Sequence, residues 1–190
     1  MANINAPKGA VPVKHLNGSP WNGQVNLYYI PASDGTPVFV GDFVKSLTNA
    51  ADANGVPAVI QSTAGANHRG SVVGFVPDPA NPLQDPNYRR ASTARYCWVA
   101  DSPDTIFEIQ ENGTMGIGAP GRNVEVTVGA GSTSTGMSGM QLNSSTLATT
   151  NTLSLRVLQA VAREDNAPAS ANAKWQVMIN LHELTQTTGV

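Results

Sequence analysis

The stretch KWQVMINLHEL, Lys174–Leu184, is the most informative segment for the fold class of this chain. One set of alternate positions carries the apolar side chains of Trp175, Val177, Ile179 and Leu181. The opposite set carries Lys174, Gln176, Asn180 and His182, with Met178 as the exception. A period of two is typical of a strand with one face on a core and the other in water. We therefore expect a half-buried β-strand here.

The same alternation recurs through Asn123–Val128 and at the start of Thr152–Val161. In the second segment the phase changes at Leu158, which favours a bulge or a short helical alternative. Further strands are expected at Gln24–Ile30, Pro37–Val44, Val56–Gln61, Ser71–Val76, Thr93–Ala100 and Thr105–Gln110. A short helix is possible at Val44–Ala53, ended by Asn54 and Gly55. Short strands separated by turn residues predict an all-β fold, a small β-barrel or a jelly-roll-like sandwich.

We expect a single domain, because the chain has 190 residues. The predicted organisation is an extended N-terminal arm, 1–22, before a β-rich body, 23–190, with a long proline-rich loop near 77–91. Prolines and glycines disfavour a helix in the arm. The arm alternates polar residues with four apolar ones, Val11, Val13, Leu16 and Trp21. An extended segment cannot bury these side chains by itself, so we expect them to hold a neighbouring subunit.

The composition favours contact surfaces over charged ones. Charged residues make up 13% of the chain and the net charge is −2, so nothing points to nucleic-acid binding. Neutral polar side chains suit permanently packed interfaces, because burying them costs less than burying charges. No apolar window approaches membrane-spanning length, and no basic segment precedes an apolar one as in a secretion signal. We expect synthesis in the cytoplasm, without export of the protein on its own.

Catalytic and cofactor motifs are weak, and we expect neither an enzyme nor a cofactor. Gly116–Gly121 fits the letters of a dinucleotide-binding loop, but Pro120 and a following strand replace the helix that such a site needs. The run Gly129–Gly139 is expected to be a flexible or surface-draped loop. Cys97 lies in an apolar strand pattern and is expected to be a core thiol.

Metal and acid–base sites are equally poorly supported by the sequence. The three histidines, His15, His68 and His182, lack the spacing of metal ligands, so no metal is expected. Asp101 and Asp104 flank Pro103, where aspartates commonly cap a turn. Of the neighbouring Tyr28 and Tyr29, one is expected to point into the core.

Four segments together resemble a family of small virion proteins of tailed bacteriophages, found beside the major capsid protein. They are residues 10–45, GSVVGFVPD at 70–78, residues 88–113 and NAKWQVMINLHEL at 172–184. Within them, VFVGDFVK followed by GSVVGFV is similar to the barrel pattern of head decoration proteins. The resemblance covers most of the chain but contains no catalytic signature.

The resemblance implies a capsid decoration, or cement, protein on the outer surface of the icosahedral head in the virion. Its implied partners are the major capsid protein and further copies of itself, as a homodimer or homotrimer. In that role Val11, Val13, Leu16 and Trp21 would be the capsid anchors. Seated over subunit junctions, such a protein would resist the outward pressure of the packaged DNA.

Two alternatives stay open at this point. The first is a ring-forming structural protein of the tail or neck, which would be present in far fewer copies per particle. The second is a carbohydrate-binding or hydrolytic β-sandwich, with Trp98 or Tyr88 lining a sugar groove near Asp101, Asp104 or Glu108. A dry strand interior around Trp98 would remove the second alternative.

Overall fold

A computed structural model of the protein describes residues 3–77 and 87–186. Within these ranges the chain forms strands and one short 3₁₀ helix, and the expected all-β class is confirmed. The strands are β1 (Val11–His15), β2 (Asn26–Ile30), β3 (Phe43–Ala51), β4 (Pro57–Gln61), β5 (Gly70–Phe75), β6 (Arg95–Ala100), β7 (Thr105–Gln110), β8 (Asn123–Thr127), β9 (Gln141–Ala148), β10 (Leu155–Ala160) and β11 (Lys174–Ile179). The 3₁₀ helix η1 is Glu183–Thr185. Most of the predicted proline-rich loop, 78–86, lies outside the described residues.

The first half of the body is a small closed barrel with the strand order β2-β4-β3-β5-β6. Antiparallel pairing of β2 with β6 and a parallel contact of β2 with β4, at Tyr29 and Ala58, close the barrel. Its interior is apolar and consists of Tyr28, Ile30, Val38, Val44, Val59, Val72, Cys97 and Val99. Tyr28 points into this core, whereas Tyr29 is half-buried, so the expectation for this pair is confirmed.

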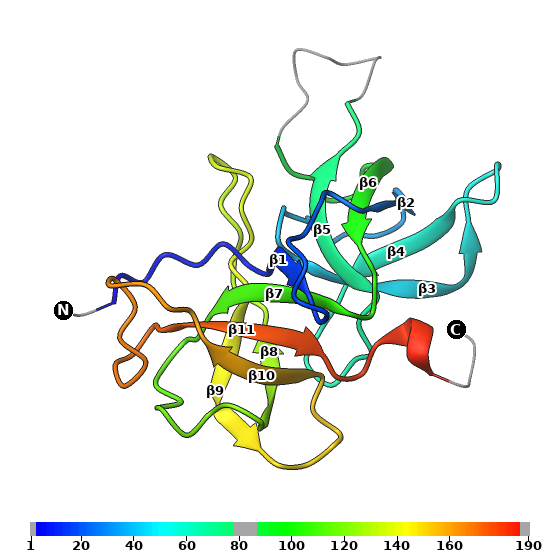
Figure 1. Ribbon diagram of the computed structural model, residues 1–190. Helices are drawn as coiled ribbons and strands as arrows, with labels where there is room; N and C mark the ends of the chain where they lie inside the picture. Colours follow the sequence, from blue (N-terminus) through cyan, green and yellow to red (C-terminus); the bar gives the residue numbers. More distant parts are fainter. Residues whose placement is uncertain (1–2, 78–86, 187–190) are drawn as a thin grey trace.

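The second half is a six-stranded sheet with the order β1-β7-β11-β10-β8-β9, in which all neighbours are antiparallel. The sheet curls, because Glu111 just after β7 forms a bridge with Leu142 in β9. In Figure 1 this sheet lies below the barrel, and the two form a sandwich-like arrangement. The core inside the curl includes Phe107, Val124, Leu142, Leu155 and Trp175.

The alternation in Lys174–Leu184 predicts the inner face of β11 correctly. Trp175, Val177 and Ile179 are all buried in the core of the sheet. The strand is shorter than expected, because the amides of Asn180 and Leu181 both donate to the Ser154 carbonyl and the chain then turns into η1. His182, expected on the polar face, is consequently buried. The bulge expected near Leu158 is confirmed by a register shift between Val157 and Gln159.

Two other expectations are wrong in their local structure. Residues of the possible helix Val44–Ala53 form strand β3 instead, because their backbone groups pair with both β4 and β5. Of the expected strand Pro37–Val44, only Phe43 and Val44 belong to a strand, β3, and the residues before them make isolated bridges at Val38 and Val40. Gly41, with a φ of 94°, turns the chain there before β3 begins at Phe43.

The extended N-terminal arm, 1–22, is not confirmed. Strand β1 occupies the edge of the six-stranded sheet and pairs with β7. The residues before it also contact the body: the side-chain amide of Asn3 donates to the carbonyls of Ala167, Ser170 and Ala171. Pro12 is tolerated in β1 because the register with β7 shifts between Pro12 and Lys14, which interrupts the ladder beside the proline.

The buried carboxylate of Asp42 joins the two halves of the molecule. It accepts hydrogen bonds from the Phe39 amide (2.9 Å), the Gln61 side chain (2.8 Å) and the Ser138 hydroxyl (2.5 Å). Ser138 belongs to the connection between β8 and β9, whereas the other two donors belong to the barrel side. Beside it Gly9 crosses Gly41 so closely that a Cβ on Gly9 would lie 2.2 Å from the Gly41 carbonyl oxygen.

The glycine-rich run 129–139 drapes over the barrel side, as one of its two expected forms predicts. Figure 1 shows this yellow-green connection extending away from the sheet. Val40 bonds it twice, donating to the Gly136 carbonyl (2.9 Å) and accepting from the Ser138 amide (2.8 Å). Gly131 lies on the ring of Phe39, which is itself stacked on Tyr88 with ring centroids 4.9 Å apart.

Gly131→Ala is expected to destabilise the protein by about 1–3 kcal/mol. An added Cβ would lie 2.3 Å from Cδ2 of Phe39, a buried ring that is stacked on Tyr88. Urea unfolding of the variant measures the loss. The matched control is Gly35→Ala, where a Cβ would meet no atom within 4 Å. Equal unfolding free energies for the two variants would contradict the packing described here.

Candidate binding surface

The four predicted anchor residues lie in one hairpin on the surface of the body. We call residues 11–21 the β1 hairpin: after β1 the chain turns, with the His15 amide donating to the Ser19 carbonyl (2.9 Å). The returning segment pairs with the outer edge of β1, where the Trp21 amide donates to the Val13 carbonyl (3.1 Å). Backbone hydrogen bonds therefore hold the hairpin on both sides.

The structure places the four side chains near one another in the chain but in different surroundings. Val11 and Leu16 are exposed, Val13 is half-buried, and Trp21 is half-buried against the core of the six-stranded sheet. Three of them line three separate hollows: Val11 lines one beside β7, Leu16 one beside Arg156, and Trp21 a third beside β6. They do not form one apolar cluster.

The hollow beside β6 is the most apolar of the three. Its lining consists of Trp21, Gly23, Val25, Val73, Gly74 and Trp98, around a volume of about 260 Å³. We call it the tryptophan groove. Trp98 keeps 39% of its surface exposed although it lies within a strand. Its partner in β5 is Gly74, which follows a register shift and has no side chain to cover the indole.

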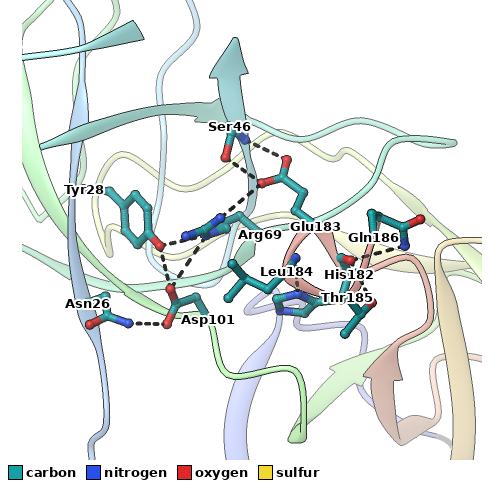
Figure 2. Close-up of polar contacts among 10 residues, drawn as sticks. All are labelled: Asn26, Tyr28, Ser46, Arg69, Asp101, His182, Glu183, Leu184, Thr185 and Gln186. Atoms are coloured by element: carbon teal, nitrogen blue, oxygen red, sulfur yellow. Dashed lines mark hydrogen bonds and ion pairs between the residues drawn. The ribbon is translucent and has the colours of Figure 1, made fainter. Parts of the chain in front are cut away.

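A polar network lies between the barrel and the end of the chain (Figure 2). Its centre is Asp101, a buried carboxylate just after β6. It accepts hydrogen bonds from the Tyr28 hydroxyl (2.5 Å) and from the side-chain amide of Asn26 (2.8 Å). The Tyr28 hydroxyl in turn accepts from Arg69 Nε (2.7 Å). Asp101 was expected to cap its own turn; instead it bonds side chains of β2.

The network continues to the C-terminal segment through Glu183. This carboxylate accepts from the Ser46 amide (2.8 Å) and the Ser46 hydroxyl (2.6 Å) in β3. Arg69 lies between the two acids, with Nη1 4.0 Å from Glu183 and Nε 3.7 Å from Asp101. The segment after β11 is thus bound to the barrel by charge and hydrogen bonds together.

The network is suited to holding structure rather than to proton transfer. Burial raises the pKa of Tyr28 well above its usual range, and the hydrogen bond to Asp101 raises it further. The hydroxyl already donates once and accepts once, so its phenolate form is strongly disfavoured. We therefore interpret it as a clamp between the barrel and η1.

Two histidines that are distant in the sequence lie together in the fold. His68 and His182 form a backbone bridge, and both rings are buried. The His68 ring stacks on Phe43, and its Nδ1 atom lies 2.7 Å from the Ser62 hydroxyl oxygen. Burial lowers the pKa of His68 to about 3 and that of His182 to about 4. Sequence spacing alone gave no sign of this pairing.

The remaining candidates of the sequence take structural positions. Cys97 is buried in the barrel, and burial raises the pKa of its thiol to about 12. Gly116–Gly121 lies in the turns between β7 and β8, and no helix opens there. Across the described ranges no three His, Cys, Asp or Glu side chains gather as metal ligands. None of the described residues forms a helix that could span a membrane.

The sequence predicts the two tryptophans of the tryptophan groove as parts of two different sites. Trp21 was expected as an anchor and Trp98 as part of a sugar groove, but their proximity was not foreseen. The alternation in β6 carried a usable signal, because Cys97 and Val99 are buried and Trp98 lies on the opposite face. Comparisons with protein-family models, with curated proteins and with solved structures find no match to this chain.

Tyr28→Phe is expected to lower the free energy of unfolding by about 1–3 kcal/mol, because the buried Asp101 carboxylate loses a donor. Tyr29→Phe is the control, since the Tyr29 hydroxyl makes no hydrogen bond to a described residue. Chemical denaturation of both variants measures the difference. If the two substitutions cost the same, the Tyr28 hydroxyl is not part of a clamp.

Acidification is expected to destabilise the fold through His68. An unfolded histidine takes up a proton below pH of about 6.5, whereas folded His68 resists protonation until pH about 3. The unfolding free energy therefore falls as the pH is lowered through this window, by about 2 kcal/mol at pH 5 from this group. Urea unfolding of His68→Asn should lack that part of the pH dependence, while His15→Asn should retain it. Parallel pH profiles for wild type and His68→Asn would contradict the expectation.

Proposed function

We propose that this protein is a capsid decoration, or cement, protein of a tailed bacteriophage. In this role it binds the outer surface of the icosahedral head and bridges subunits of the major capsid protein. The observation that carries the proposal is the tryptophan groove, an apolar recess that leaves a large aromatic side chain partly uncovered. Buried aromatic anchors of this kind supply much of the binding energy of protein interfaces.

Three further features support a role in permanent assembly. The low charge content of 13% reduces the cost of burying the surface around the groove. The β1 hairpin is hydrogen-bonded on both edges, so little conformational entropy would be lost on binding. The resemblance of most of the sequence to virion proteins points in the same direction.

The proposed mechanism is bridging by a rigid body. Interfaces of standard size bury about 1,200–2,000 Å² in total, and the hairpin with its three hollows offers several points of contact. A body that contacts two shell subunits at once gains from effective concentration without needing a strong single contact. Repeated over a symmetric shell, these contacts would oppose separation of the subunits under DNA pressure. Binding by a detached arm is not part of this mechanism.

A second candidate function has one specific observation in its favour. Trp98 is not in a dry strand interior, and two indoles beside a shallow recess are chemically suited to stacking on a sugar ring. Titration with oligosaccharides, followed by tryptophan fluorescence, tests that alternative directly. A tail or neck ring is distinguished by copy number, which is in the hundreds for a head protein and about six or twelve for a ring.

Trp98→Ala is expected to weaken attachment to phage heads by about tenfold or more, because it removes an aromatic anchor. Co-sedimentation of the purified protein with heads that lack it measures the attachment. Ile117→Ala is the control, since Ile117 is 80% exposed in the connection between β7 and β8 and lies outside the groove. The isolated variants should unfold at similar temperatures.

Two results would count against the proposal. Failure of the wild-type protein to bind heads would remove the decoration function itself. Normal binding by Trp98→Ala would leave attachment possible but would exclude the tryptophan groove as its anchor.

A further inference from the structure

A second hollow beside the β1 hairpin is lined by positive charge. It lies where the N-terminal segment meets the end of β7 and the start of β11, and its volume is about 260 Å³. Its cationic lining consists of Lys8, Arg163 and Lys174, and Val11 supplies an apolar wall. We call it the cationic pocket.

The positive charge of this pocket is only partly neutralised within the chain. Arg163 pairs with two acids: its Nη2 lies 2.6 Å from Oε1 of Glu108, and its Nε lies 3.5 Å from Oδ1 of Asp165. Neither Lys8 nor Lys174 makes a hydrogen bond through its amino group, or an ion pair, with another described residue. The positive charge of the pocket that no acid of the described chain pairs is therefore that of Lys8 and Lys174, in a protein whose net charge is −2.

The pocket is built on fixed backbone. The Ala10 amide donates to the Gly41 carbonyl (2.8 Å), and Gly9 packs against Gly41, so the position of the segment carrying Lys8 is set. Lys174 lies in β11 opposite Gln110 of β7. The Gln110 side chain is already used, since it donates to the carbonyls of Ile4 and Asn172 and accepts from the Ala6 amide. The two lysines are therefore the free polar groups best placed for a ligand.

Charge complementarity and the mixed lining identify the kind of occupant. Two ammonium groups beside an apolar side chain match a carboxylate on a protein segment that also carries an aliphatic group. A nucleic-acid backbone fits less well, because it needs a row of cations along its length and the chain as a whole is acidic.

We propose that the cationic pocket binds an acidic side chain of the shell subunit on which the protein sits. This inference rests on the proposed decoration function and adds its electrostatic component. The carboxylate sits between Lys8 and Lys174, and the aliphatic part of the same segment contacts Val11. Val11 thereby contributes to attachment through this pocket, separately from the apolar contact made at Trp98.

The test compares single variants that each remove one positive charge. Lys8→Gln and Lys174→Gln are titrated against phage heads that lack the protein, at low and at high salt. Each is expected to bind about tenfold more weakly at low salt, with a smaller difference at high salt, where screening already weakens the ion pairs. Arg90→Gln is the control: Arg90 is exposed, lies outside the pocket and changes the net charge by the same amount.

The outcomes separate this inference from the proposed function. No binding by the wild-type protein overturns both. Binding by the wild type together with lysine variants that behave like Arg90→Gln overturns the cationic pocket and leaves the decoration function standing. Lys8→Arg and Lys174→Arg keep the charge, so their retention of binding supports the inference even if a glutamine variant proves less stable.

Discussion

The rest of the structure depends on one buried acidic side chain, that of Asp42. It lies where the barrel, the N-terminal segment and the connection between β8 and β9 meet, and its hydrogen-bond donors come from both halves of the molecule. Burial raises its pKa, while the bonds from Ser138, Phe39 and Gln61 oppose that shift. An isolated buried carboxylate would be costly, so the halves are held in the one arrangement that supplies all three donors.

That junction also determines the surface on which the functional proposals rest. The close approach of Gly9 to Gly41, with the hydrogen bond from the Ala10 amide to the Gly41 carbonyl, fixes the N-terminal segment just before it enters β1. The tryptophan groove, the cationic pocket and the hollow beside Leu16 all lie around the resulting hairpin. An apolar recess and a basic one that both include residues of the same hairpin can together select the position and the chemistry of a bound partner.

The titratable groups away from this surface stabilise the fold. Asp101 and Glu183 are joined through Arg69, and this arrangement fastens η1 to the barrel. His68 and His182 are buried near these ion pairs, and burial keeps both rings neutral. Perturbed pKa values often mark active sites, but ion-pair and hydrogen-bond networks that bind two structural units produce them as well. Here the acids and the Tyr28 hydroxyl are occupied by partners within the chain.

Local pattern alone determined the strands whose residues alternate between a core and a solvent face. β7 was predicted with its observed bounds, the inner face of β11 was correct, and the change of phase near Leu158 marks a bulge, one of the two forms expected there. The same pattern could not reveal β9, which is mostly polar, or β1, which contains a proline. Both are strands because a neighbouring strand supplies backbone partners, β8 for β9 and the distant β7 for β1, and backbone pairing leaves no period in the sequence.

Tertiary structure likewise decided the candidate site. The four anchor residues could be named from the sequence. The expected arm would have placed their side chains on a neighbouring subunit, whereas the observed hairpin places them on the surface of the same chain. Only the fold placed Trp98 beside Trp21, and Lys8 beside Lys174. The sequence by itself determined an all-β chain with few charges, because composition and alternation are local properties. The groove, the basic pocket and the paired histidines depend on which distant strands meet, and that is settled by packing and by the satisfaction of buried polar groups such as Asp42.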